Sequence, residues 1–170
     1  MAHFRAATTA TDRVAALLAL NRSSSPRRLK TLEDVYQEWH GHNSGYANYL
    51  RVVPSGTRPD VFEMIEAEKK RASFDITHPT WSRALILPMA INNKMVWTDR
   101  GITWVADTVI EFAPINGIMA SRLLHAFQHC AKLKPDLQAK VRIALGRIVE
   151  EVPEKVSPTV HGQAQSYLAE

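Results

Sequence analysis

The apolar residues of this chain recur at the three- and four-residue spacing of an α-helix, in short segments that proline, glycine and polar turns interrupt. Residues 102–112 show the pattern well, with Trp104, Val105, Val109 and Phe112 at helical spacing. The alternation typical of a half-buried strand is absent from the sequence over any useful length. We therefore expect an all-α protein whose amphipathic helices bury their apolar faces against one another.

Prolines and capping residues divide the sequence into about nine expected helices. Thr31 is expected to cap the second helix, with Asp34 three residues later as a variant of the capping box. Residues 92–101 are expected to form a polar loop. The expected helical segments are residues 11–21, 32–39, 46–50, 59–71, 79–86, 102–112, 118–133, 135–148 and 158–168.

The length of 170 residues and a hydrophobic content of 45% suit a single domain, residues 1–170, with a core of its own. Short turns between successive helices favour antiparallel pairs. An orthogonal bundle and a helical-repeat solenoid both fit this rhythm, and no strict sequence period separates them.

Charge and cysteine content exclude several classes of function. The formal net charge is only +4, and the basic residues are interleaved with acidic ones, so no dense nucleic-acid-binding patch is evident. The one cysteine, Cys130, excludes an internal disulfide and a cysteine-rich zinc module, and we expect it to pack in the interior. No apolar run reaches the eighteen or so residues of a membrane-spanning helix.

The N-terminal segment allows two interpretations. Residues 1–30 contain five Arg and one Lys against a single acid, Asp12, together with many Ala, Ser and Thr. That composition resembles a mitochondrial transit peptide, but it also suits a basic first helix of the folded domain, which is the interpretation we favour. The compartment is therefore left open, with an intracellular location expected and the mitochondrion as one candidate.

The motif HAFQH, residues 125–129, has the histidine spacing of the zinc-protease motif H-E-x-x-H, with Ala126 in place of the catalytic glutamate. If residues 118–133 form one helix, His125 and His129 face away from the apolar side, next to two cations. No third ligand is evident, so we expect a solvated or partner-facing pair rather than a metal site. The expected apolar face comprises Ala120, Leu123, Leu124, Phe127 and Ala131.

Other catalytic signatures are also absent from the sequence, which contains no G-x-S-x-G motif, phosphate-binding glycine loop or G-x-G-x-x-G motif. We therefore expect no catalytic, cofactor-binding or metal-binding residues. Trp97 stands apart from the other tryptophans because it lies in the polar segment NNKMVWTDRG. Core packing and a partner contact are both open for it, and Arg100 of the same segment is a second candidate contact.

Several segments, taken in order, resemble a known family. They include ATDRVAALLAL near the start, YANYLRVV, SFDITHPTWSRALI, INGIMASRLLHAFQ and VRIALGRIVEEV. The most telling positions are Thr11-Asp12-Arg13, Phe74 with Pro79 and Arg83, and Ala120-Ser121-Arg122-Leu123. In this order and spacing the chain resembles, over nearly its whole length, the C-terminal helical domain of M1-family alanyl aminopeptidases of the bacterial aminopeptidase N type.

The resemblance implies a superhelical, ARM/HEAT-like array of antiparallel helix pairs that covers the active-site chamber of the peptidase. It also implies that the zinc ligands and the general base lie in a preceding catalytic domain, which these 170 residues do not contain. Without a zinc-bound water and a base, these residues alone are not expected to catalyse peptide hydrolysis.

Two departures from the family pattern concern function. Thr80 follows Pro79 where the family usually has Asn, and residues 96–102 replace a glycine-rich D-G-S-G-Y-like loop that faces the chamber. This pattern, with Met1 opening at the first helix, predicts a stand-alone, non-catalytic scaffold or interaction subunit of a larger protein assembly. Trp97, Arg100, His125 and His129 are its candidate partner contacts.

Two alternatives remain open. The chain could be a separately expressed C-terminal part of a genuine zinc alanyl aminopeptidase, acting only with its catalytic part. A weaker alternative is a protein that binds metal directly through His125 and His129.

Overall fold

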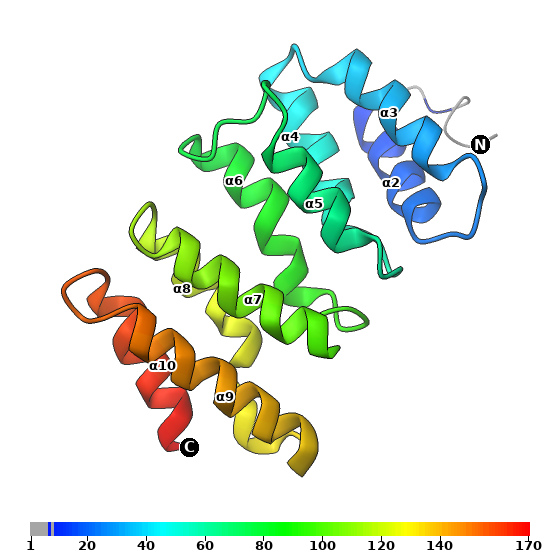
Figure 1. The fold of residues 1–170 in the computed structure, drawn as a ribbon. Helices are drawn as coiled ribbons and strands as arrows, with labels where there is room; N and C mark the ends of the chain where they lie inside the picture. Colours follow the sequence, from blue (N-terminus) through cyan, green and yellow to red (C-terminus); the bar gives the residue numbers. More distant parts are fainter. Residues whose placement is uncertain (1–6, 8) are drawn as a thin grey trace. The chain divides into compact units, whose positions relative to one another are not determined.

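The computed structural model describes residue 7 and residues 9–170, and these residues form nine α-helices and no strand (Figure 1). The all-α expectation is therefore confirmed. The chain divides into two compact units, Met1–Pro88 and Met89–Glu170, and passes from one to the other within the 3-10 segment Leu87–Ile91. The expectation of one domain over residues 1–170 stays a prediction. In the described part of the chain, no helix combines the length and the apolar character needed to cross a membrane.

The N-terminal unit is organised around one central helix, α4, which contacts α2, α3 and α6. Tyr46, Tyr49 and Leu50 on α4 are almost completely buried, so the helix is apolar on more than one side and has to lie inside the unit. The elements are α2 (Ala10–Asn21), α3 (Arg28–Trp39), α4 (Asn43–Val52), the 3-10 helix η1 (Val53–Ser55), α5 (Val61–Lys69) and α6 (Pro79–Ile86).

The helix α2 forms where the sequence predicts it, and it places residues 10–21 of the basic N-terminal segment in the fold. The Thr9 side chain accepts a hydrogen bond from the Asp12 backbone N–H at 3.1 Å, which caps the helix, and Asp12 lies in its first turn. Leu17 is fully buried. Residues 10–21 thus form a first helix of the folded unit, as we favoured, although Asp12 and Arg13 balance its charge. The rest of the transit-peptide interpretation falls partly on residues 1–6 and 8, which lie outside the described residues.

The expected start of the second helix was wrong. The helix α3 begins at Arg28 with Arg27 at the N-cap position, and no side chain caps it. Thr31 lies inside the helix and is buried, not at its cap. The earlier start has a physical reason, because it brings Arg28 into the first turn of α3, where its guanidinium reaches both Asn21 and Asp60.

A buried polar junction joins the end of α2 to the end of α4. The Asn21 amide donates to the carbonyl oxygens of Val52 at 2.7 Å and Val53 at 3.1 Å, at the C-terminal end of α4. Its own oxygen accepts a hydrogen bond from Arg28 at 3.0 Å, and Arg28 in turn pairs with Asp60. This junction therefore satisfies polar groups from three segments at once.

Replacing Asn21 by Ala should destabilise the protein by about 2–4 kcal/mol, because two carbonyls and the Arg28 guanidinium lose a buried partner. Urea unfolding followed by circular dichroism measures the change. The control is Asn93→Ala at an exposed turn position, which should shift stability by less than about 0.5 kcal/mol. Equal effects of the two substitutions would contradict the role given to Asn21.

The C-terminal unit pairs four helices, α7 (Asp99–Phe112), α8 (Gly117–Leu124), α9 (Pro135–Glu151) and α10 (Pro158–Ala169). Each of them contacts two of the others: α7 packs on α8 and α9, and α10 packs on α8 and α9. In Figure 1, α7 in green lies beside α9 in orange, with α10 in red next to α9. The fully buried core side chains include Val105, Val109, Phe112, Leu123, Leu145 and Ile148.

The expected polar loop over residues 92–101 is shorter than predicted, because α7 begins at Asp99 instead of residue 102. Thr98 is its N-cap: the hydroxyl accepts from the Gly101 backbone N–H at 3.0 Å and donates to the Met95 carbonyl at 2.7 Å. Nor is the segment wholly polar in its environment, since Met95 and Val96 are buried. The cap was readable as Thr-Asp followed by a helical pattern, but the glycine three residues on argued against a helix there.

Candidate interaction site in the C-terminal unit

The HAFQH motif does not lie on an α-helix. The helix α8 ends at Leu124, and the chain continues through two 3-10 turns, η3 (His125–Phe127) and η4 (Cys130–Lys132). The expected single helix over residues 118–133 was therefore wrong, and so was the helical wheel beyond Leu124. Phe127 and Cys130 are both fully buried, as a tighter turn allows, whereas Ala131 is exposed instead of packed.

The two histidines nevertheless have the exposure expected of them. His125 and His129 are both exposed, at either end of a turn that Phe127 holds in the core. In the described part of the chain, no group of three His, Cys, Asp or Glu side chains is placed to hold a metal ion. The arrangement supplies surface imidazoles that can donate or accept hydrogen bonds.

Trp97 lies against this turn. Its ring is half-buried, and its centroid lies 6.4 Å from that of Phe127 at an interplanar angle of 39°. The contact brings together two candidate segments that are about thirty residues apart in sequence, the turn before α7 and the turn after α8. Arg100 is exposed on the first turn of α7. We refer to Trp97, Arg100, His125 and His129 as the Trp97–HAFQH surface.

Gly101 fixes the position of the turn that carries Trp97. A β-carbon at this residue would lie 2.0 Å from the Met95 carbonyl oxygen and 2.7 Å from that of Val96. Since both atoms belong to the backbone, the clash has no cheap relief, and only glycine allows this approach. The close packing explains how a glycine occupies the first turn of a helix.

Substituting Gly101 by Ala should destabilise the protein by about 1–3 kcal/mol and shift the Trp97 environment, because the turn has to move away from α7. Thermal unfolding and tryptophan fluorescence measure the two effects. Gly146→Ala is the matched control: it lies in α9 with no atom within 4 Å of the added methyl, so helix propensity should make it neutral or stabilising by up to about 1 kcal/mol. A harmless Gly101→Ala would contradict the packing described.

A second surface feature of the unit, which no sequence pattern indicated, is a groove between α7 and α9. It has a volume of about 270 Å³, and we call it the α7/α9 groove. Ion pairs span it at both ends, Asp99 with Lys140 at 2.5 Å and Asp107 with Arg147. The lining residues are Asp99, Ile102, Thr103, Ala106, Lys140, Ile143, Ala144 and Arg147.

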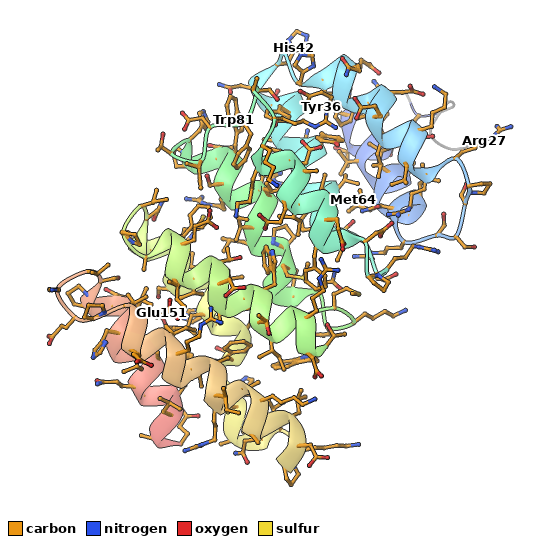
Figure 2. All side chains as sticks on the ribbon, viewed as in Figure 1. Arg27, Tyr36, His42, Met64, Trp81 and Glu151 are labelled. Carbon is orange, nitrogen blue, oxygen red and sulfur yellow. The ribbon has the colours of Figure 1, made fainter. Side chains whose placement is uncertain are left out.

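The N-terminal unit contains a cluster of aromatic side chains that joins three of its helices. Tyr36 on α3 and Trp81 on α6, both labelled in Figure 2, are connected through Tyr46 of α4, whose ring centroid lies 6.0 Å from that of Tyr36 and 5.2 Å from that of Trp81. The Arg71 guanidinium lies 3.7 Å from the centroid of the Tyr36 ring, in a cation–π contact. Burial raises the pKa of Tyr46 to about 12, so its hydroxyl stays protonated at neutral pH.

A buried carboxyl group, Glu68, lies beside this core. It accepts hydrogen bonds from the Tyr49 hydroxyl at 2.7 Å and from Arg71 at 2.8 Å. Burial raises the pKa of Glu68, with the Tyr49 hydrogen bond and Arg71 opposing the shift. Arg71 also binds Glu33, on the surface, and its hydrogen bond is the main cause that lowers the pKa of that carboxyl. All these groups have structural partners, so the cluster indicates stability rather than catalysis.

Because the pKa of Glu68 is raised in the folded state, its stabilising contribution is complete below the ordinary glutamate range and is lost as the pH rises through the raised value. Glu68→Gln carries no charge, so its stability relative to the wild type should increase between that range and neutral pH. Urea unfolding at a series of pH values measures this difference, with the exposed Glu154→Gln as a flat control. A relative stability that falls with pH would mean that Arg71 outweighs burial.

Comparison with known proteins defines the class of this chain. A family model described as a domain of unknown function with ARM repeats, DUF3458_C, matches residues 1–167, so the chain belongs to this family of ARM-repeat domains. It is 27% identical over 152 residues to aminopeptidase N of Caulobacter vibrioides, a match that covers 88% of this chain and 18% of the relative.

The fold has a counterpart among solved structures. The crystal structure of Legionella pneumophila aminopeptidase A in complex with aspartic acid superposes with a TM-score of 0.86 at 24% identity, covering 99% of this chain and 20% of that one. The predicted resemblance to the C-terminal helical domain of M1 aminopeptidases is thus confirmed, as is the all-α, ARM-like fold class. The chain spans about a fifth of the length of these relatives.

Proposed function

We propose that this chain is a non-catalytic helical interaction module, which acts by binding another protein and not by carrying out a reaction. The observation that carries the proposal is the contrast between interior and surface. Buried polar side chains such as Asn21 and Glu68 are engaged in hydrogen bonds that hold helices together. The candidate contact residues of the Trp97–HAFQH surface, by contrast, are exposed or half-buried.

The chemistry of the Trp97–HAFQH surface suits a protein partner. A half-buried tryptophan supplies a rigid apolar contact, and the exposed Arg100 and two exposed histidines supply hydrogen-bond donors. Aromatic and arginine side chains contribute most of the energy at many protein interfaces. This supports a role as a subunit of a larger protein assembly, in which the helical scaffold fixes the positions of the contact residues.

A second candidate is favoured by the comparisons. Both relatives are aminopeptidases, and each contains a region similar to nearly all of this chain within a protein about five times as long. On this alternative, the chain is the C-terminal part of a zinc aminopeptidase and covers the active-site chamber of the catalytic part. The Trp97–HAFQH surface then contacts that catalytic part, in place of a separate subunit.

The test combines two measurements on the 170-residue chain. In the first, the chain is copurified from its native source, and native mass spectrometry identifies any stoichiometric partner. In the second, the chain is added to the Caulobacter aminopeptidase N lacking the matching region, and peptide hydrolysis is followed. A partner without an effect on hydrolysis supports the scaffold, and restored hydrolysis supports the alternative. If the chain has no partner and does not restore hydrolysis, the proposal is overturned.

Substitutions on the Trp97–HAFQH surface should weaken whichever complex forms. Trp97→Ala combined with His125→Ala and His129→Ala should lower affinity at least tenfold, which corresponds to about 1.4 kcal/mol. His42→Ala, an exposed histidine of the N-terminal unit, is the control and should leave affinity unchanged. Circular dichroism verifies that the triple variant stays folded, and unchanged binding by that folded variant would exclude this surface.

A further inference from the structure

The α7/α9 groove combines an apolar hollow with one large apolar side chain left in solvent. The small residues Ala106 and Ala144, both buried, lie on facing sides of the groove and leave it open. Ile143, on α9 at its edge, is 74% exposed. An aliphatic side chain in water beside an unfilled apolar hollow is unfavourable for an isolated chain, and burying it against a second surface removes that cost.

The two walls of the groove carry opposite charges. Asp99 and Asp107 lie on α7, and Lys140 and Arg147 lie on α9. Asp99 pairs with Lys140, and Asp107, which comes later on α7, pairs with Arg147, which comes later on α9. The two helices therefore run parallel. Each wall therefore repeats one sign of charge after about two helical turns, or about 10–12 Å, and matching levels carry opposite signs.

We infer that the α7/α9 groove is the contact surface of a symmetric dimer of this chain, with the two-fold axis running along the groove between the two helices. Rotation about that axis places the acidic α7 wall of one copy over the basic α9 wall of the other, at the same level along the helices. A two-fold axis perpendicular to the helices would instead place acid on acid and base on base. Charge complementarity thus selects one orientation of the second copy.

The same rotation accounts for Ile143. Since Asp99 pairs with Lys140 and Asp107 with Arg147, Ile143 lies at about the level of Thr103 on α7. In the dimer each Ile143 rests over the groove of the other copy, against its α7, where a volume of about 270 Å³ can receive a large aliphatic side chain. The contact is isologous, so every favourable interaction occurs twice. This inference goes beyond the proposed function and does not depend on which partner that function involves.

The first test removes the apolar contact. For the wild-type chain, light scattering after size-exclusion chromatography should give a mass of twice 19.1 kDa at high protein concentration. Ile143→Glu should reduce the mass to 19.1 kDa, because it places a charge in the hollow. Ile118→Glu is the matched control: Ile118 is 71% exposed on α8 of the same unit but does not line the groove, so the dimer should persist.

The second test uses the charges of the walls. Lys140→Glu with Arg147→Glu makes both walls acidic, and Asp99→Lys with Asp107→Lys makes both basic, so each double variant alone should be monomeric. Mixed in equal amounts, the two should form a heterodimer. The quadruple variant exchanges the signs of both walls, restores the two ion pairs across the groove, and should dimerise like the wild type. Raising the ionic strength should weaken every one of these dimers.

Three outcomes of these experiments would contradict the inferred dimer. A wild-type chain that stays at 19.1 kDa at all concentrations overturns the inference. So does a dimer that survives Ile143→Glu, or two wall variants that stay monomeric when mixed while thermal unfolding shows both to be folded. Since exposed ion pairs contribute little to stability, the double variants should fold. The quadruple variant keeps both ion pairs across the groove and loses only the pair of Arg147 with Glu151 within α9.

Discussion

The fold depends on how the ends of its short helices are satisfied. Its α-helices are between 8 and 17 residues long, so a large share of the backbone N–H and C=O groups lie in first or last turns without a partner in their own helix. Side chains supply many of the missing partners. Thr9, Thr98, Asn116 and Ser157 cap the N-termini of α2, α7, α8 and α10, each accepting a backbone N–H. Asn21, at the end of α2, donates to two carbonyls at the C-terminal end of α4 and so links the two helices.

These end contacts also explain which parts of the fold could be predicted from sequence. The all-α fold class and most helices were predictable from sequence. The helical spacing of apolar residues and the prolines at positions 79, 135 and 158 determine local structure without a distant partner. Errors arose where a contact that the sequence pattern does not show decided the boundary. Arg28 begins α3 early in order to reach Asp60, and Gly101 allows α7 to begin early because the Met95 carbonyl packs on it. Neither contact has a local signal.

The candidate site, too, could be predicted from the sequence only in part. The exposure of His125 and His129 was predictable from their polar neighbours, but the 3-10 turns that carry them were not, because burial of both Phe127 and Cys130 selects a tighter turn than the α-helix. The contact between Trp97 and Phe127 and the α7/α9 groove depend on which helices pack together. The spacing of Lys140 and Arg147 is visible in the sequence; their acidic partners are known only from the fold.

The two surfaces of the C-terminal unit share one structural support, the first turn of α7. Trp97 precedes the Thr98 cap, and Asp99, which follows it, forms one end of the α7/α9 groove. Thr98 holds this turn through bonds to Met95 on one side and Gly101 on the other, so the turn positions both surfaces at once. Any displacement of the turn should therefore alter partner binding and self-association together, whereas Ile143 and His125 lie far enough along the chain from it to affect one surface each. The two proposed interactions can thus be separated by substitution, although they depend on the same helix start.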